Sequence, residues 1–146
     1  MKNLTSLFFA VMLFSMTSCD TKKAQEDTDT VDYNTVQLDA PFKMTQKKGV
    51  KFENDDLKIT FDNISEDSRC PEGTTCVWEG QVKVNLTVKT KNGSEKVEIL
   101  RKGKQKENAI QQIGTHTIYL MAVNPYPRES KPKMVQEDYK ITMIVK

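Results

Sequence analysis

Cysteine, histidine and tryptophan are scarce in this chain, whose 146 residues include three cysteines, one histidine and one tryptophan. The sequence also lacks the glycine-rich phosphate loops, dinucleotide fingerprints, zinc-protease motifs and Gly-x-Ser-x-Gly elbows that mark many enzymes. These absences favour a protein without catalytic activity. They also predict that it uses no cofactor and no metal ion.

A long hydrophobic run is absent too. The longest one, Leu7–Phe14, is far shorter than the roughly 20 residues that a membrane-spanning helix needs. It follows Lys2 and precedes Ser15-Met16-Thr17-Ser18-Cys19, the order of a secretory signal. The junction at Cys19 resembles a bacterial lipoprotein signal, which implies that residues 1–18 are removed and that the thiol of Cys19 receives lipid. Because two or three acyl chains anchor stably, we expect attachment to the inner or outer membrane of a Gram-negative-type bacterium, with the domain in the periplasm or at the cell surface.

The rest of the chain divides into a tether and one domain. Residues 19–34 are acidic, polar and nearly free of apolar side chains, so they predict a disordered tether. Within this stretch, Asp29-Thr30-Val31 resembles an O-glycosylation site of exported proteins. Residues 35–146 suit a single domain of ordinary size. The net charge of the whole chain is +2 and its basic residues are dispersed, which argues against a nucleic-acid partner.

Strand-like alternation dominates residues 35–146. From Cys76 to Lys89, apolar or small residues occupy the even positions and polar residues the odd positions from Glu79 onward, which predicts one long strand with a buried face. Asn92-Gly93 then predicts a hairpin turn. The other predicted strands are Glu95–Arg101, Val50–Glu53, Leu57–Asp62, Thr115–Val123 and Tyr139–Val145, with an edge strand at Val36–Leu38 or Phe42–Thr45.

A helical turn is predicted only at Glu107–Ile113, before Gly114. Six to eight short strands without a substantial helix predict an all-β fold. We expect an antiparallel two-layer β-sandwich of about immunoglobulin-domain size, with a small barrel as the alternative.

Cys70 and Cys76 remain as a pair once Cys19 is assigned to lipid. In an exported protein this pair favours a disulfide that closes a small loop containing Pro71 and Gly73. A metal site would need two further ligands, and His116 is isolated in the sequence. A redox role would suit a Cys-x-x-Cys spacing, but five residues separate these two cysteines.

Trp78 follows Cys76 by two residues, so in a strand both side chains would point to one side. The favoured interpretation is a core aromatic residue that covers the disulfide. The alternative is an exposed stacking platform for a sugar or a peptide, formed together with Arg69.

Several short motifs occur together in the predicted domain: Ser68-Arg69-Cys70-Pro71, Cys76-Val77-Trp78-Glu79-Gly80 and Pro125-Tyr126-Pro127. The chain thereby resembles a group of small uncharacterised exported bacterial proteins and lipoproteins that share Ser-Arg-Cys-Pro, Cys-x-Trp-x-Gly and Pro-Tyr-Pro elements. The resemblance extends over most of the region from Phe42 onward. It supports the domain assignment and implies no particular activity.

Other polar residues are explained by structure at least as well as by function. His116 shares the alternation of its strand, which favours a half-buried histidine over a catalytic base. The carboxylates of Asp55-Asp56 and Glu66-Asp67 could bind calcium only if the two turns met, and turn chemistry explains them more simply. Tyr126 lies between two prolines in a stiff loop, where it either seals the core or contacts a partner.

These observations support three functional hypotheses. The leading one is a lipid-anchored, non-enzymatic binding module that contacts an envelope protein or a glycan through Arg69, Trp78 and Tyr126. The alternatives are a small envelope hydrolase or protease inhibitor that acts through the same loops, and a structural component of the envelope.

Overall fold

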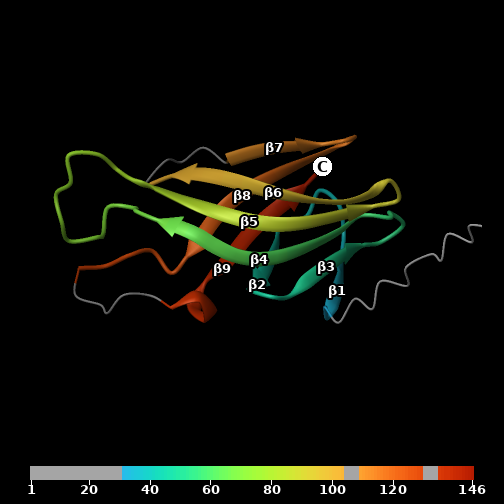
Figure 1. The fold of residues 1–146 in the computed structure, drawn as a ribbon, viewed down its shortest axis with the longest axis horizontal. Coiled ribbons are helices and arrows are strands. Elements are labelled where there is room, and N and C mark those ends of the chain that lie inside the picture. Colours follow the sequence, from blue (N-terminus) through green and yellow to red (C-terminus); the bar gives the residue numbers. More distant parts are fainter. Residues whose placement is uncertain (1–30, 104–108, 130–134) are drawn as a thin grey trace, which may run out of the picture.

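The computed structural model describes residues 31–103, 109–129 and 135–146. Their strands form two sheets that face each other as an all-β sandwich, and the sheets do not close into a barrel (Figure 1). The five-stranded sheet has the order β1 (Tyr33–Val36), β3 (Gly49–Phe52), β4 (Lys58–Asp67), β5 (Gln81–Thr90), β6 (Gly93–Lys102). The four-stranded sheet has the order β2 (Phe42–Thr45), β9 (Lys140–Val145), β8 (His116–Asn124), β7 (Ala109–Ile113). The predicted fold class is therefore confirmed.

Pairing between the described strands is antiparallel except between β1 and β3, which are parallel. β1 begins at Tyr33, so the last two residues of the predicted tether belong to the sheet. The predicted lipidation site at Cys19 and the residues Asp29-Thr30 lie outside the described residues. Of the two segments proposed as alternative edge strands, Phe42–Thr45 is confirmed as β2 at the edge of its sheet, whereas Val36–Leu38 is wrong, because the edge strand β1 already ends at Val36.

The core lies between the two sheets and follows from the alternation in the sequence. In β5 the even-numbered residues from Val82 to Val88 are fully buried, while the residues between them are partly exposed. The buried residues of β5 pack opposite buried side chains of β8 and β9, including Leu120 and Met143. Burying apolar side chains on both inner faces is what holds two such sheets together.

Two predicted elements differ from those observed. Residues 109–113 form strand β7 instead of part of a helical turn, because they pair with β8 and bury Ile113. The long strand begins at Gln81 rather than at Cys76, because the backbone turns at Gly80 with φ of 68°. The predicted hairpin is confirmed, although its two loop residues are Lys91 and Asn92, and Gly93 already pairs with Thr90.

The antiparallel order brings two long connections to the same end of the sandwich. β4 ends and β5 begins there, separated by residues 68–80, which we call the disulfide loop. β8 ends and β9 begins at the same end, separated by residues 125–139, which we call the Pro-Tyr-Pro loop and which include the short 3-10 helix η1 (Gln136–Asp138). In Figure 1 both connections lie at the left, whereas β1 lies in the right half of the molecule.

Candidate functional site

The disulfide loop and the Pro-Tyr-Pro loop are joined along their backbones. Glu72 and Arg128 form a parallel β-bridge, in which the amide of Glu72 donates to the carbonyl of Pro127 over 2.9 Å and the amide of Glu129 donates to the carbonyl of Glu72 over 3.2 Å. An ion pair of 2.9 Å between Arg128 Nε and Glu72 Oε2 adds a side-chain contact. Two loops far apart in sequence are thereby braced against each other.

The predicted disulfide between Cys70 and Cys76 is confirmed. Outside this bond, the two limbs of the loop are also paired at their base. The amide of Cys70 donates to the carbonyl of Glu79 over 2.9 Å, and the amide of Ser68 donates to the carbonyl of Gln81 over 2.8 Å. The disulfide loop therefore leaves the sheet as a closed and cross-linked unit.

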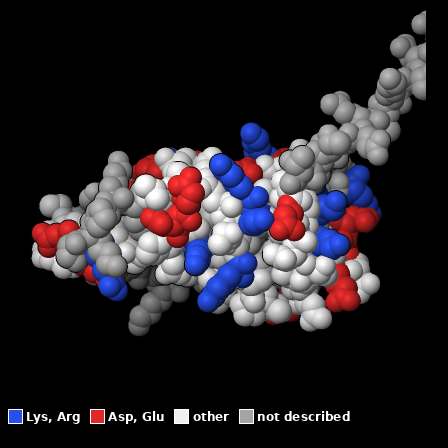
Figure 2. Space-filling model, turned by 90° about the horizontal axis from the view of Figure 1, so that it is seen from below, with Lys and Arg blue, Asp and Glu red and all other residues white. Residues whose placement is uncertain are grey.

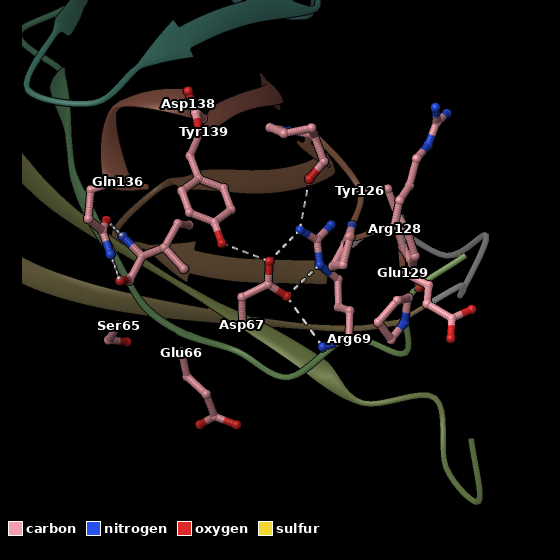
Figure 3. Close-up of a pocket in the computed structure, with 14 residues that line it drawn as sticks. Ser65, Glu66, Asp67, Arg69, Tyr126, Arg128, Glu129, Gln136, Asp138 and Tyr139 are labelled. Atoms are coloured by element: carbon pink, nitrogen blue, oxygen red, sulfur yellow. Dashed lines mark hydrogen bonds and ion pairs between the residues drawn. The ribbon is translucent and has the colours of Figure 1, made fainter. Parts of the chain in front are cut away.

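Arg69 and Asp67 form a buried ion pair beneath the two loops (Figure 3). Their side chains are 3% and 7% exposed, and the Nη2 of Arg69 lies 2.6 Å from the Oδ2 of Asp67 while Nε lies 2.8 Å from Oδ1. This two-pronged arrangement is the strong form of an arginine–carboxylate contact. The pairing compensates the cost of burying each charge.

The guanidinium of Arg69 also holds the Pro-Tyr-Pro loop. It donates to the carbonyl of Val123 over 2.7 Å and to the carbonyl of Pro125 over 3.1 Å. Its central carbon lies 4.8 Å from the centroid of the Tyr126 ring, within the range of a cation–π contact. One side chain of the disulfide loop thus fixes the end of β8 and the start of the Pro-Tyr-Pro loop.

Tyr139 completes this cluster from the start of β9. Its hydroxyl donates to Asp67 Oδ2 over 3.0 Å, and the residue is 5% exposed. Burial raises the pKa of Tyr139 from 10.0 to about 12, and the negative charge of Asp67 acts in the same direction. The folded protein therefore holds this phenol in its neutral form.

This pKa predicts a loss of stability in strong alkali. A raised folded-state pKa means that the contribution of Tyr139 is present below the usual pKa of 10.0 and is lost as the pH rises toward about 12. We expect one of the four tyrosines to titrate near that upper value when tyrosinate absorbance is followed in the folded protein. Tyr139→Phe should remove this late step, and its persistence in that variant would assign it to another tyrosine.

Tyr126 lies across Arg69 with a half-buried ring, and its hydroxyl is buried without a hydrogen-bond partner among the described residues. Burial raises the pKa of Tyr126, and the nearby charge of Arg69 opposes that shift. A buried hydroxyl without a partner is uncommon in folded proteins. This group is the one polar side-chain atom among the described residues that the fold buries and leaves unsatisfied.

An open groove of about 950 Å³ lies over this cluster, between β4, the two loops and η1. Its lining combines the proline-rich turn and two tyrosines with charged and amide side chains (Figure 3). The lining residues are Ile64, Ser65, Glu66, Asp67, Arg69, Pro71, Pro125, Tyr126, Pro127, Arg128, Glu129, Gln136, Asp138 and Tyr139. Gln136 fixes the η1 side, since its amide donates to the carbonyl of Ile64 over 2.8 Å and its side-chain oxygen accepts from the amide of Ile64 over 3.1 Å.

Of the three proposed binding residues, the structure brings Arg69 and Tyr126 together and keeps Trp78 apart. Trp78 is 61% exposed and lies on the disulfide loop, so the interpretation as a core aromatic residue is wrong. The physical reason is that residues 76–79 belong to the closed loop, where the two-residue alternation of a strand does not apply. The alternative of an exposed Trp78 is confirmed, but Arg69 does not join it in a platform, because Arg69 is buried in its ion pair.

The exposure of Trp78 predicts a simple spectroscopic result. Because it is the single tryptophan of the chain, all tryptophan emission comes from the disulfide loop. We expect acrylamide to quench the native protein nearly as efficiently as the denatured chain. Strong shielding in the native state would contradict the exposed position.

The remaining sequence candidates lie elsewhere. His116 is half-buried, as predicted, and its Nε2 lies 2.9 Å from Oδ2 of Asp55, which ties the β3–β4 turn to the start of β8. Asp55-Asp56 precede β4 and Glu66-Asp67 end it, so the two acidic pairs lie at opposite ends of one strand and do not meet. The part of the chain that the structure describes holds no cluster of three metal-ligating side chains, and no helix in it could cross a membrane.

Sequence reasoning missed the roles of Asp67 and Tyr139. β-bulges between Phe61 and Asn63 and between Ile64 and Glu66 shift the alternation of β4 twice. Strict alternation along β4 therefore does not predict on which face of the sheet Asp67 lies. Spacing offered one usable signal, since Asp67 and Arg69 are two residues apart and extended backbone places such residues on one side.

Comparison of the chain with protein-family models, curated proteins and solved structures gave no match. The geometry of the groove and its loops is therefore the basis for a functional proposal.

Proposed function

We propose that this protein is a lipid-anchored, non-enzymatic binding module of the bacterial cell envelope that holds its partner in the groove over Asp67 and Arg69. The observation that carries the proposal is the way the groove is built. A buried ion pair forms its floor, and two loops that are hydrogen-bonded to each other form one wall.

This construction suits binding because the described parts of the two loops are hydrogen-bonded to each other before a partner arrives. A braced loop loses little conformational freedom on association, which leaves more of the contact energy as affinity. The lining also fits a binding role, since tyrosine and proline supply rigid apolar surface and arginine, carboxylate and amide groups supply orientation. The partner expected from the sequence is an envelope protein or a glycan.

A groove-filling substitution tests the site. Ser65 is exposed and lines the groove, so Ser65→Tyr should obstruct it while the core stays intact. The matched control is Ser94→Tyr, because Ser94 is also exposed but begins β6 near the opposite end of the sheet. We expect chemical cross-linking in intact cells to yield a partner with the native chain and with Ser94→Tyr, and to lose it with Ser65→Tyr.

The outcomes of this experiment separate the hypotheses. Equal cross-linking by both tyrosine variants would overturn the groove assignment. Contacts confined to neighbouring structural proteins would favour a structural role in the envelope. Turnover of a substrate, or inhibition of a protease, by the purified domain would favour the enzyme or inhibitor hypothesis, provided that Ser65→Tyr abolishes it.

The proposed anchor has its own test. We expect cells supplied with a labelled fatty acid to transfer the label to the native chain, and Cys19→Ser to prevent the transfer. Mass spectrometry of the native product should show loss of residues 1–18. A full leader, or an unmodified thiol at Cys19, would overturn the anchored location without affecting the groove.

A further inference from the structure

The disulfide loop presents two neighbouring apolar side chains to solvent. Val77 is 107% exposed and Trp78 is 61% exposed, and Trp78 is by far the larger. Indole rings are rarely left so open, because they carry a large apolar surface whose burial is favourable. An exposed apolar surface of this kind is a common sign of a contact site.

The loop that carries this tip is firmly held. Besides its disulfide and the bonds at its base, the carbonyl of Gly80 accepts from the amide of Gly103 over 2.8 Å, and Glu72 is bonded to the Pro-Tyr-Pro loop. Trp78 therefore lies on a loop that several hydrogen bonds and a disulfide hold in place, and it is exposed in spite of these contacts. Such a support keeps the flat ring in place for a ligand that stacks on it.

The segment that carries Trp78 also carries polar side chains that can form hydrogen bonds. Thr75 and Glu79 are both exposed on the same loop. Between Cys70 and Gly80 the loop contains two glutamates, Glu72 and Glu79, and no basic residue. A loop that exposes an aromatic face together with hydroxyl and carboxylate groups matches the chemistry of a sugar ring, which has an apolar C–H face and a rim of hydroxyl groups.

We infer that Trp78 is a stacking site for a polysaccharide of the cell envelope, and that the exposed side chains of Thr75 and Glu79 on the same loop bond the hydroxyl groups of the sugar. The inference rests on the proposed function only for the location of the domain. It concerns a different surface from the groove, because Trp78 does not line that groove.

Two features favour a glycan over a lipid bilayer. Between Cys70 and Gly80 the loop carries two acidic residues and no basic one, and Arg128 of the other loop offsets only Glu72, so this segment offers no cluster of basic side chains for an anionic membrane surface. Acidic side chains are also grouped in the left part of the face shown in Figure 2, the end at which the disulfide loop lies in Figure 1. In addition, the disulfide loop lies at the left end of the sandwich, whereas β1, the first strand of the domain, lies in the right half (Figure 1).

The single tryptophan makes the test direct. The probes are soluble β-linked N-acetylglucosamine oligomers, purified peptidoglycan, a neutral glucan, and vesicles of phosphatidylethanolamine with phosphatidylglycerol. We expect at least one glycan to shift the emission of Trp78 to shorter wavelength and to protect it from acrylamide, and we expect the vesicles to do neither. No response to any glycan, or a response to vesicles alone, would overturn the inference.

Substitutions then separate stacking from other contacts. Co-sedimentation with the responding glycan in insoluble form should weaken about tenfold in Trp78→Ala and much less in Trp78→Phe, which keeps an aromatic face. Both variants should fold, since the ring is largely exposed, and circular dichroism checks this. Equal binding by Trp78→Ala and the native chain would overturn the inference.

The same glycan assay distinguishes this inference from the proposed function. Ser65→Tyr should leave binding to the glycan unchanged while it abolishes the partner held in the groove. Trp78→Ala should do the reverse. A loss of glycan binding in Ser65→Tyr would place the glycan in the groove and overturn the assignment to Trp78.

Discussion

Arg69→Met is expected to lower the free energy of unfolding by about 3–5 kcal/mol, the cost of breaking a buried ion pair by removing one partner. The substitution leaves the carboxylate of Asp67, which is 7% exposed, without its counter-charge. It also removes the donors that the carbonyls of Val123 and Pro125 use. Urea unfolding followed by circular dichroism measures the effect.

The matched control is Arg128→Met, which breaks the ion pair with Glu72. Those side chains are 56% and 49% exposed, so the expected cost is only about 0–1 kcal/mol. Similar losses in the two variants would contradict a special role for burial at Arg69. A third variant, Asp67→Leu together with Arg69→Met, removes both charges and should recover part of the loss, because an uncompensated buried charge is the main cost.

Gly80→Ala is expected to destabilise the protein by about 2 kcal/mol more than Gly114→Ala. Both glycines have positive φ, 68° and 56°, so both substitutions carry the strain of a left-handed backbone. They differ in the space available, since a Cβ on Gly80 would overlap the carbonyl group of Ser68 and the Cα of Arg69, whereas nothing lies near a Cβ on Gly114. The difference between the variants therefore isolates the overlap, and overpacking of this kind costs about 1–3 kcal/mol.

The overlap at Gly80 also predicts where the damage appears. Relief of the clash must move Ser68 or Arg69, which lie at the base of the disulfide loop, and Arg69 is itself a member of the buried ion pair. We expect hydrogen exchange to accelerate at the amides of Ser68 and Cys70 in Gly80→Ala and to stay slow in Gly114→Ala. Equal stability of the two variants would show that the backbone adjusts without cost.

Prediction from the sequence was most accurate where strand alternation and turn signals continue without interruption. Burial of one face of β5 and the hairpin to β6 both follow from alternation and from an Asn-Gly turn signal. The disulfide followed from the pairing of the only two cysteines left after Cys19. Prediction was wrong at Trp78 and at residues 109–113, because loop closure in one case and pairing with β8 in the other overrode the local pattern.

The sequence predicted which two loops form the candidate site, but it did not predict which side chains are buried and paired there. Both loops were proposed as the contact region, and the structure places them side by side through Glu72 and Arg128. The burial of Arg69 could not be foreseen, because its partners Val123 and Pro125 lie more than fifty residues away in sequence. Bulges in β4 also hid the face of Asp67.

By itself, the sequence determined the strands of an all-β fold, a closed cysteine loop and a proline-rich loop, since each depends on residues that are near neighbours along the chain; it left a two-sheet sandwich and a small barrel as alternatives. Tertiary structure alone decided which charged and aromatic groups became the floor of a groove and which one faced solvent. Those outcomes depend on the packing of two sheets against each other. That packing brings together β4 and β8, whose ends are distant in sequence, and excludes water from the ion pair between them.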